Sequence, residues 1–417
     1  MDITRRAFLA TSCLATAWPA RLQARANQAV EFPWSDVRNV LQERFSALKR
    51  HIIFEYYPWY ANDPFRHWQQ WGRVPPADIA TNLVPQLGPY DSRSTAVIEQ
   101  HARWIVESGV GVVDLSWWGR DSFSDTVVSR VMDVMADYDI HVTFHLEPYG
   151  LNRVENILSD VRYLVQEFGE KRNWDCFYLN QRMDGSKGPI FKFFNTTLPE
   201  HIEDCHGELQ KITGYFPDSV WRKATDELRL FLEKEFQHVT LLSNTRDAPR
   251  ARAAGFDGIA TYDPAIEPEQ YLDFASSASQ NDMLFSFNVN PGWDEIIQRN
   301  VPENSCYQER PFLPRTRKLN WAEADDRELA RLLSESRILE SLQGNLLLQL
   351  HPWFGNVDAG FFLVYITSFN EWHEGTAFEP MQNRAEMSTL QQAMEYHNPS
   401  DGYYRLRSLQ ELLAKLL

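Results

Sequence analysis

Residues 361–375 have the sequence FFLVYITSFNEWHEG. The first seven are apolar, aromatic or β-branched, as in a buried strand, and the polar cluster begins where that strand should end. Within the cluster, Glu371 and Glu374 lie three residues apart. In a barrel of parallel strands the chemistry lies at the carboxyl ends of the strands. This stretch therefore predicts a last barrel strand that carries two carboxyl groups at its tip.

Seven earlier segments have a similar apolar, β-branched character. They cover residues 52–56, 110–116, 140–145, 190–194, 239–243, 256–262 and 284–288. Segments with helical spacing lie between many of them, at residues 94–107, 125–138, 154–168, 219–235 and 322–342. Parallel strands need crossover helices, and eight strands close a sheet. We therefore predict an α/β fold, a (β/α)8 TIM barrel with enlarged βα loops; a doubly wound open sheet is the alternative.

The composition indicates one large globular domain. The chain has 417 residues, is 43% hydrophobic, and shows no repeat, low-complexity tract or Gly/Ser linker. The formal net charge of −16 disfavours nucleic acid and acidic polysaccharides as partners, so neutral glycans fit better. Residues 292–317, which contain several prolines, predict a long loop over one face of the barrel.

The first 26 residues have the pattern of a targeting segment. Residues 4–9, TRRAFL, form a twin-arginine motif that leads into an apolar stretch ending at residue 17. Residues 24–26, ARA, offer a cleavage site, and no later run is apolar and long enough to span a bilayer. We expect a signal peptide over residues 1–26, a single domain over residues 27–417, and export to the periplasm or the medium.

The cysteines leave two possibilities open. Cys13 belongs to the leader, and Cys176, Cys205 and Cys306 are far apart without a C-x-x-C spacing. One disulfide with one free thiol and three buried free thiols are both compatible with this pattern.

Polar and aromatic side chains follow the predicted strands, and in a barrel they would converge at one mouth. Besides the pair Glu371 and Glu374, which we predict to be catalytic, the predicted substrate-binding residues are Tyr56, Tyr57, Trp59, Trp117, Trp118, His145, Glu147, Tyr149, Tyr262, Asn288, Asn370, Trp372 and His373. Sugars stack their C–H faces on rings and offer hydroxyls to carboxylates and amides. Glycoside hydrolysis needs two carboxyl groups with separate protonation roles. These residues therefore predict a polysaccharide or oligosaccharide substrate.

Other interpretations of the same residues exist. The two carboxylates could cap a helix or face solvent, and the aromatic groups could be ordinary core packing. His145, Glu147, His373 and Glu374 are of the types that bind zinc or manganese, but no H-E-x-x-H helix accompanies them. No Gly-rich phosphate loop is present either. We therefore expect no metal and no cofactor.

Seven motifs are shared with a known family. They are YYPWY at 56–60, PPADI at 75–79, LGPY at 87–90, LSWW at 115–118, VTFHLEPY at 142–149, GFDGI at 255–259 and ITSFNEWHEGT at 366–376. Together they cover most of the chain from about residue 52 to 379. In these motifs the chain resembles glycoside hydrolase family 99, the endo-α-mannosidase and endo-α-1,2-mannanase family.

The resemblance implies a (β/α)8 barrel of the metal-independent, retaining kind that cuts within α-mannoside chains. Glu371 matches the residue thought to deprotonate the sugar's own 2-hydroxyl, which then attacks the anomeric carbon and gives a 1,2-anhydro sugar. Glu374 matches the acid/base. Glu147 and Tyr262 match positions near the sugar that adjoins the cleaved bond, and Trp118 matches an aromatic residue that contacts the next sugar outward.

The chain departs from the family pattern at three places. Phe194-Asn195-Thr196-Thr197 stands where a Tyr-Asp-Ser-Tyr run is expected, Ala260 replaces an aromatic residue, and the region 292–317 is longer than usual. These changes alter sugar recognition. Two further functions therefore remain open: a non-catalytic glycan-binding or polysaccharide-assembly protein on the same barrel, and a metal-dependent hydrolase.

Overall fold

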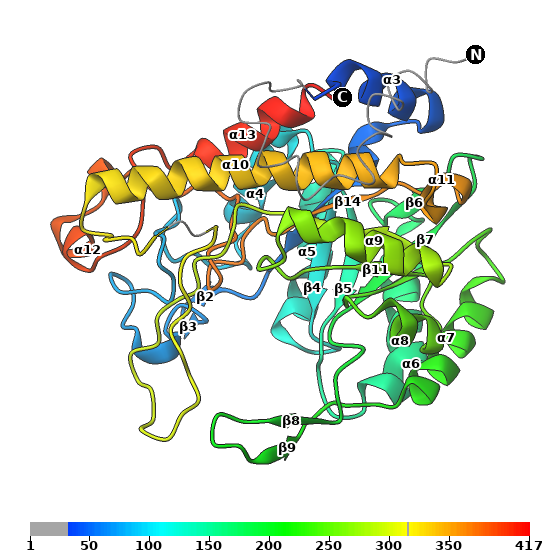
Figure 1. Cartoon of the computed structure of the whole chain (residues 1–417), viewed down its shortest axis with the longest axis horizontal. Helices are drawn as coiled ribbons and strands as arrows, with labels where there is room; N and C mark the ends of the chain where they lie inside the picture. The colour runs from blue at the N-terminus through cyan, green and yellow to red at the C-terminus, as the bar shows by residue number, and fades with distance from the viewer. Residues whose placement is uncertain (1–31, 315–316) are drawn as a thin grey trace.

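The apolar segments form one sheet of parallel strands around which helices are arranged (Figure 1). The computed structural model describes residues 32–314 and 317–417, so the predicted leader lies outside the described residues. In barrel order the strands are β1 (Ile52–Tyr56), β4 (Val112–Trp117), β5 (His141–Leu146), β7 (Lys187–Phe193), β10 (Thr240–Ser243), β11 (Gly258–Ala260), β12 (Leu284–Ser286) with β13 (Asn288–Val289), and β14 (Val364–Ile366).

The seventh strand closes the barrel. Its first part, β12, pairs with β11, and after Phe287 its second part, β13, pairs with β14. Strand β14 also pairs with β1, which puts the last strand beside the first. Counting β12 and β13 as one strand gives the predicted eight. The predicted (β/α)8 barrel is confirmed, and the open doubly wound sheet is excluded.

Helices cover the outside of the barrel. They are α4 (Thr95–Ser108), α5 (Phe123–Asp137), α6 (Arg153–Leu164), α7 (Asp218–Leu232), α8 (Ala248–Ala253), α9 (Tyr271–Gln280) and α10 (Ala324–Gln349), with α3 (Trp34–Arg44) and α13 (Tyr404–Leu413) near the two ends of the described chain. Two short helices, α11 (Gly355–Asp358) and α12 (Thr389–Ala393), lie in loops. None of the described helices has both the length and the apolar character of a membrane span.

The five predicted helices are present, with shifted ends. Helix α10 continues seven residues past the predicted end at Leu342, because residues 343–349 keep one face buried against the barrel. The prediction over residues 154–168 combines α6 with a π-helical turn at Val165–Gly169. Sequence spacing did not reveal α3, α8, α9 or α13.

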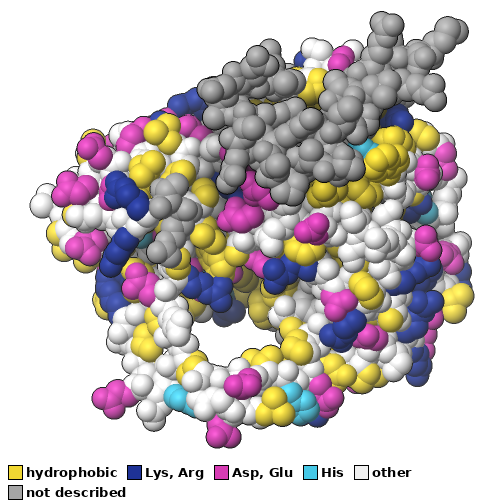
Figure 2. All heavy atoms as spheres, viewed as in Figure 1, with side chains coloured by type: hydrophobic (Ala, Val, Ile, Leu, Met, Phe, Trp, Pro, Cys, Tyr) yellow, Lys and Arg dark blue, Asp and Glu magenta, His cyan; other side chains and the backbone are white. Residues whose placement is uncertain are grey.

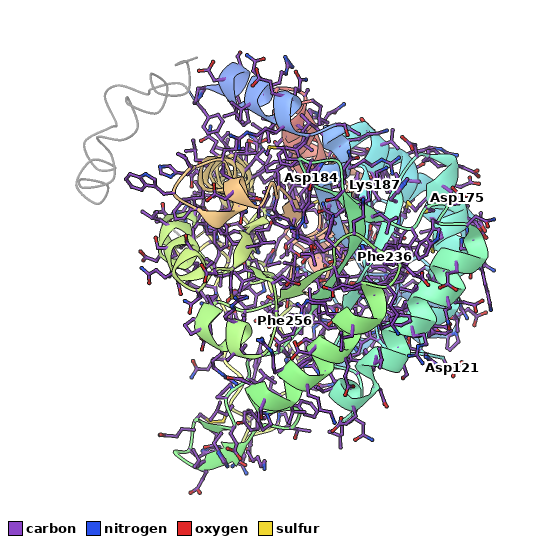
Figure 3. All side chains as sticks on the ribbon, turned by 90° about the vertical axis from the view of Figure 1, so that its right-hand side faces the viewer. Asp121, Asp175, Asp184, Lys187, Phe236 and Phe256 are labelled. Carbon is purple, nitrogen blue, oxygen red and sulfur yellow. A yellow bond between two sulfur atoms is a disulfide. The ribbon has the colours of Figure 1, made fainter. Side chains whose placement is uncertain are left out.

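The βα loops are enlarged, as predicted. They carry two antiparallel pairings, β2 (Ala61–Asn62) with β3 (Phe65–Arg66) and β8 (His201–Glu203) with β9 (Leu209–Lys211), while β6 (Leu179–Gln181) pairs with β7 from the connection before that strand. The described part of the region 292–317 contains no helix or strand beyond one bridge between Trp293 and Leu313, which confirms the predicted long loop. In the side view the hairpin of β8 and β9 extends away from the barrel (Figure 3).

Side chains along each strand point alternately to the outer core, between strands and helices, and to the interior of the barrel. In β1, Phe54 and Tyr56 belong to the large cluster between strands and helices, whereas Ile53 belongs to the interior cluster. Successive strand residues point to opposite faces. Glu55 therefore points inward with Ile53, as do Asp114 on β4 and Lys192 on β7, all of which are fully buried.

Lys192 and Glu55 form an ion pair in the barrel interior. The hydroxyl of Thr367 also donates to Glu55, and the Lys192 ammonium lies 4.6 Å from the centre of the Tyr365 ring. Burial raises the pKa of the nearby Asp114 well above its usual range, although Lys192 opposes the shift. A single lysine thus compensates charge in a region that contains several acids.

We expect Lys192→Met to lower the free energy of unfolding by about 3–5 kcal/mol, because it leaves Glu55 buried without its partner. Urea unfolding at neutral pH measures this change. The double variant Lys192→Met/Glu55→Gln should be less destabilised than the single one. Lys187→Met, at the exposed start of the same strand, is the matched control and should stay within about 0.5 kcal/mol of the parent. A Lys192→Met protein as stable as this control would contradict the prediction.

Candidate active site

The turn after β14 holds Glu371 and Glu374 in place through its own backbone. The Glu371 N–H donates to Ser368 Oγ (2.7 Å), and the Trp372 N–H donates to the Tyr60 hydroxyl (3.1 Å). Gly375 then adopts φ +64°, and a Cβ at this position would lie 2.6 Å from Asp294. Only glycine fits this close approach without strain. The turn is therefore a defined structure rather than a flexible link.

Glu371 lies deep in the site, with 4% of its surface exposed. Its Oε1 accepts a hydrogen bond from the His373 N–H (2.9 Å) and lies 3.7 Å from His373 Nδ1. Burial, followed by repulsion from Glu374, raises the pKa of Glu371 well above its usual range. Burial also lowers the pKa of His373 to about 3, so this imidazole is neutral. Glu371 is thus a carboxyl group that retains a proton readily.

Glu374 is more accessible and lines a cavity. Its Oε2 accepts a hydrogen bond from the Tyr262 hydroxyl (2.7 Å). Burial raises the pKa of Glu374 to about 7, and the Tyr262 hydrogen bond opposes this rise. Two neighbouring carboxyl groups with raised pKa values hold one proton between them over part of the pH range. Such a pair can give a proton at one oxygen and take one at another.

The cavity beside Glu374 has a volume of about 360 Å³. Its walls come from the loops after β7, β10 and β11 and from the long loop, and they include Phe194, Asn195, Thr197, Asn244, Arg246, Tyr262, Trp293 and Arg310. Three of these are residues of the Phe194–Thr197 run, and two belong to the enlarged region 292–317. Two of the three places where we expect a departure from the family pattern therefore meet on one side of Glu374.

Aromatic rings form another wall of the site. Tyr57 lies with its ring centre 4.8 Å from that of Trp59 and 6.3 Å from that of Tyr262. Trp59 also lies 6.1 Å from Trp118 and 6.3 Å from His373, which it stacks on. Trp118 is 38% exposed, so its face is open to a ligand.

Glu147 belongs to the same mouth. Its Oε1 accepts a hydrogen bond from Ser116 Oγ (2.7 Å), and Ser116 Oγ accepts one from Trp118 Nε1 (3.2 Å). Burial raises the pKa of Glu147 to about 8, against the lowering effect of Ser116. Glu147 is therefore largely protonated at neutral pH and can donate a hydrogen bond to a sugar hydroxyl.

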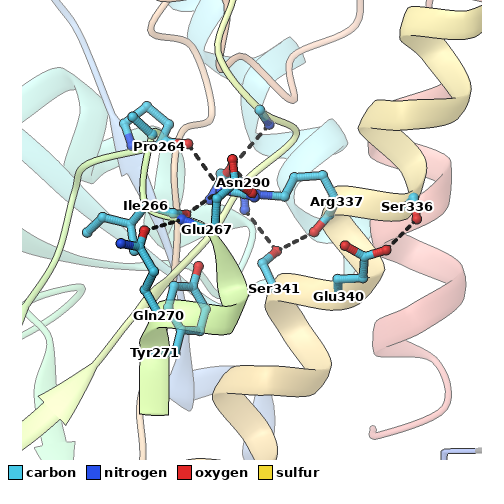
Figure 4. A network of polar contacts seen from close by, with 12 residues as sticks. Pro264, Ile266, Glu267, Gln270, Tyr271, Asn290, Ser336, Arg337, Glu340 and Ser341 are labelled. Carbon is cyan, nitrogen blue, oxygen red and sulfur yellow. Dashed lines mark hydrogen bonds and ion pairs between the residues drawn. The ribbon is translucent and has the colours of Figure 1, made fainter. Parts of the chain in front are cut away.

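Two loops that carry site residues are fixed to helix α10 by Arg337 (Figure 4). Its guanidinium donates to the carbonyl oxygens of Pro264 and Ile266, pairs with Glu267, and donates to Asn290 Oδ1 (3.2 Å). Tyr262 precedes the first of these segments and Trp293 follows Asn290. Arg337 thus connects the two segments that carry Tyr262 and Trp293 to helix α10.

Several predicted substrate-binding residues do not reach the mouth. Tyr56 points outward, where its hydroxyl lies 3.0 Å from His101 Nδ1, and Trp117 points outward to donate to Asp125 Oδ1 (2.8 Å). Trp372 is fully buried and donates to Glu379 Oε2 (3.1 Å), and Tyr149 donates to Asp160 Oδ2 (2.9 Å). For Tyr56 and Trp117 the reason is the two-residue period of a strand, which sends Tyr57 and Ser116 inward instead.

Three more predicted residues lie behind the mouth and support it. Asn370 Oδ1 accepts from the Tyr57 N–H (2.7 Å), and Asn288 Nδ2 donates to the Tyr262 carbonyl oxygen (2.7 Å). His145 is buried below Glu147, and burial, together with Lys192, lowers its pKa well below the usual range. Asn370 and Asn288 thus hold the backbone of Tyr57 and Tyr262, whose rings lie beside the carboxyl pair.

The residues of the metal alternative do not come together as a ligand set. In the described part of the chain, three-residue groups with ligand atoms within 4.8 Å of one another are Glu55–Asp114–His145 and Cys205–His206–Cys306, and neither contains Glu147, His373 or Glu374. In the first group Lys192 already pairs with Glu55, and in the second the two cysteines form a disulfide. A divalent cation in the first group would lie beside the Lys192 ammonium, and in the second group it would find disulfide sulfur in place of thiolates.

The sequence analysis missed several residues around the site. Asn244 and Arg246 directly follow β10, a strand end where no candidate was named, although a polar residue after a strand was the signal used elsewhere. Trp293 and Arg310 come from the long loop, and no sequence pattern placed them near Glu374. Glu55, Asp114 and Lys192 were hidden within apolar segments, where strand alternation would have indicated an inward direction.

Comparison with known proteins identifies the family. The model of glycosyl hydrolase family 99 matches residues 47–309. The glycoprotein endo-alpha-1,2-mannosidase of Mus musculus is 26% identical over 83% of this chain and 71% of its own length. The glycoprotein endo-alpha-1,2-mannosidase-like protein of Homo sapiens is 25% identical over 83% of this chain and 72% of its own length.

A solved structure shares the fold. The GH99 endo-alpha-mannosidase from Bacteroides thetaiotaomicron superposes with a TM-score of 0.60 at 23% identity, over 88% of this chain and 97% of that one. The family match ends before Glu371 and Glu374, whereas the barrel continues through them. With more than half of the chain matched, this protein belongs to glycosyl hydrolase family 99 and is a glycoside hydrolase.

Proposed function

We propose that this enzyme is an exported, endo-acting, retaining α-mannosidase that acts on α-mannan or related α-mannosides through a 1,2-anhydro sugar. The observation that carries the proposal is the buried carboxyl pair at the tip of β14: burial raises the pKa of Glu374 to about 7, and burial, followed by repulsion from Glu374, raises the pKa of Glu371 well above its usual range. The relative named glycoprotein endo-alpha-1,2-mannosidase supports the substrate class.

The first step begins with Glu371 as base. Glu371 removes the proton of the sugar's 2-hydroxyl, and O2 attacks the anomeric carbon as the glycosidic bond breaks. Glu374 gives its proton to the leaving oxygen. An axial O2 lies opposite an α leaving group, so back-side attack is available and the enzyme needs no nucleophile of its own, unlike the common retaining arrangement.

The second step reverses the proton movements. Glu374 takes a proton from water, the water oxygen attacks the anomeric carbon and opens the three-membered ring, and Glu371 returns its proton to O2. Each step inverts the anomeric centre, so the product keeps the starting configuration. The pair ends with the same single proton with which it began.

The single proton must lie on Glu374 when the first step starts. Burial raises the pKa values of both Glu371 and Glu374, so the pair retains one proton near neutral pH. A sugar 2-hydroxyl that donates to Glu371 stabilises its ionised form, and a glycosidic oxygen that accepts from Glu374 stabilises its protonated form. Bound substrate therefore moves the proton to the carboxyl group that needs it.

The remaining site residues have binding roles in this proposal. Glu147, as a neutral acid, donates to a hydroxyl of the sugar that adjoins the cleaved bond. Trp118 stacks on the next sugar outward with its exposed face. Tyr57 and Tyr262 lie beside the carboxyl pair and narrow the space around the reacting sugar.

Two alternative functions have less support. A non-catalytic glycan-binding or polysaccharide-assembly protein would have no need for two buried carboxyl groups with raised pKa values, because their burial lowers stability. A metal-dependent hydrolase would need His145, Glu147 and His373 within reach of one ion, and these do not form such a group in the described chain.

Export is also part of the proposal. The twin-arginine pattern over residues 4–9 directs folded proteins across a membrane. Of the two possibilities for the cysteines, the described residues have one disulfide, between Cys205 and Cys306, and one free thiol. The disulfide supports an oxidising compartment. Cys176 is the buried free thiol. We further propose that residues 27–417 function as one domain after removal of the leader.

Incubation with α-1,2-mannan should release oligosaccharides. Glu371→Gln and Glu374→Gln should each reduce kcat/KM by about 10²–10⁴-fold, because an amide neither accepts nor gives the proton. Product analysis by chromatography measures the rates, and circular dichroism checks folding. Glu411→Gln, on the exposed face of α13, is the control and should leave activity unchanged. No product from any α-mannoside, or full turnover in both variants, would refute the proposal.

We expect kcat/KM to rise with pH through about pH 7 and to fall at higher pH. Below about pH 7 both carboxyl groups are protonated and Glu371 cannot act as base; one proton leaves the pair near pH 7, which gives the active state, and activity falls at higher pH when the remaining proton is lost. Tyr262→Phe removes a hydrogen bond that lowers the pKa of Glu374, so the rising limb should move to higher pH. Activity that declines steadily between pH 5 and 7 would contradict the assignment, as would an unmoved limb in Tyr262→Phe.

Replacement of both leader arginines, as Arg5→Lys/Arg6→Lys, should retain the protein inside the producing cell with its leader attached. Twin-arginine export depends on that pair, so fractionation and the mass of the mature chain report the effect. Arg21→Lys lies in the same leader outside the motif and should leave export intact. Equal export of both forms would show that the motif is not used.

A further inference from the structure

Two arms with exposed tips extend from the barrel mouth. The hairpin arm, residues 199–212, contains β8 and β9 and is closed at its base by a hydrogen bond from the Ile212 N–H to the Glu200 carbonyl oxygen (2.9 Å). The long-loop arm, residues 293–313, is closed at its base by reciprocal hydrogen bonds between the backbones of Trp293 and Leu313 (2.9 and 2.8 Å). Each arm is thus a loop with a fixed base.

The tips of the arms are joined to each other by the Cys205–Cys306 disulfide. The Cys205 N–H also donates to Cys306 Sγ (3.3 Å), and His206 Nε2 lies 3.3 Å from the Asn304 carbonyl oxygen. Every residue of β8 and β9 is exposed, so the hairpin gains no support from the hydrophobic core. The disulfide therefore holds one arm to the other rather than to the barrel.

The joined arms and the barrel rim form a closed ring. The hairpin arm follows β7 and the long-loop arm follows β13, while β10 and β11 lie between these strands in the sheet. Figure 2, drawn from the same side as Figure 1, shows an opening through the molecule above the hairpin of β8 and β9. On one side of this ring the bases of the two arms are joined through the barrel, and on the other side their tips are joined by the disulfide.

The ring borders the cavity that contains Glu374. Pro199 at the base of the hairpin arm and Trp293 and Arg310 of the long-loop arm line that cavity. The Arg310 guanidinium lies 4.4 Å from the centre of the Trp293 ring and 3.5 Å from Glu295. The guanidinium covers one face of the Trp293 ring, so Arg310 rather than the ring offers donors to a sugar hydroxyl, and the arms contribute binding surface as well as enclosure.

We propose that the Cys205–Cys306 disulfide makes the cleft beside Glu374 a closed ring that admits only a linear glycan with a free end. This inference rests on the proposed mannosidase function and narrows its substrate class. A polymer can enter an open groove from the side, but it enters a closed ring only by an end. A glycan with bulky groups on every end, including a densely branched mannan, is therefore excluded.

A linear α-mannan oligosaccharide carrying biotin at both ends, through linkers longer than the arms, tests the proposal. Streptavidin added to this molecule blocks both ends and leaves the mannose chain unchanged. The parent enzyme should cleave the free molecule and lose activity on the blocked one. The ring-opened variant, Cys205→Ser/Cys306→Ser, should cleave both. Lys211→Ser, in the hairpin arm with the disulfide kept, is the matched control and should behave as the parent.

The outcomes separate this inference from the proposed function. Equal cleavage of free and blocked chains by the parent overturns the ring and leaves the mannosidase proposal intact. Inhibition of the ring-opened variant by streptavidin overturns the role of the disulfide. Failure of the parent and the Lys211→Ser control to cleave the free chain overturns the mannosidase proposal. The inference about the closed ring is then overturned as well. If the ring-opened variant is inactive on the free chain, the parent treated with a mild reductant replaces it, and inactivity there too overturns the inference.

Discussion

Burial of acidic groups inside a closed barrel is the constraint on which the rest of this structure depends. Glu55, Asp114, Glu147 and Glu371 are all buried, and the Lys192 ammonium forms an ion pair with Glu55. An ionised carboxylate in a dry site is unfavourable unless it is paired. Glu55 is therefore paired with Lys192, and the pKa values of the other three are raised. Burial of these acids thus lowers stability, and it also supplies carboxyl groups that can exchange protons near neutral pH.

The barrel mouth divides into two parts with different character. On one side, the rings of Tyr57, Trp59 and Trp118 belong to motifs shared with the family, and the carboxyl pair lies beside them. On the other, Phe194 to Thr197, the loop after β10 and the long loop surround Glu374. In the proposed function, the proton transfers and the recognition particular to this chain are thus assigned to different parts of the mouth. Insertions in surface loops are tolerated because they leave the strands and helices unchanged.

The fold could be predicted from the sequence because barrel strands are buried on both faces and are therefore apolar almost throughout. Each of the eight predicted segments corresponds to a strand, and the five predicted helices have long amphipathic patterns. Helices α8 and α9 were missed because they are short, and α3 and α13 because they lie outside the strand alternation. For the site, position after a strand was a good guide to the mouth but not to direction, which explains why Tyr56 and Trp117 face the helices.

The sequence by itself determined the barrel, the place of Glu371 and Glu374 at the tip of the last strand, and the family. These properties depend on local patterns: apolar runs, their spacing, and motifs that occupy consecutive residues. Only the tertiary structure decided which oxygens and rings meet, that Lys192 pairs with Glu55, and that Cys205 pairs with Cys306 across 101 residues. Such pairings depend on distances between segments far apart in the chain, and pKa shifts depend on burial, which no local pattern contains.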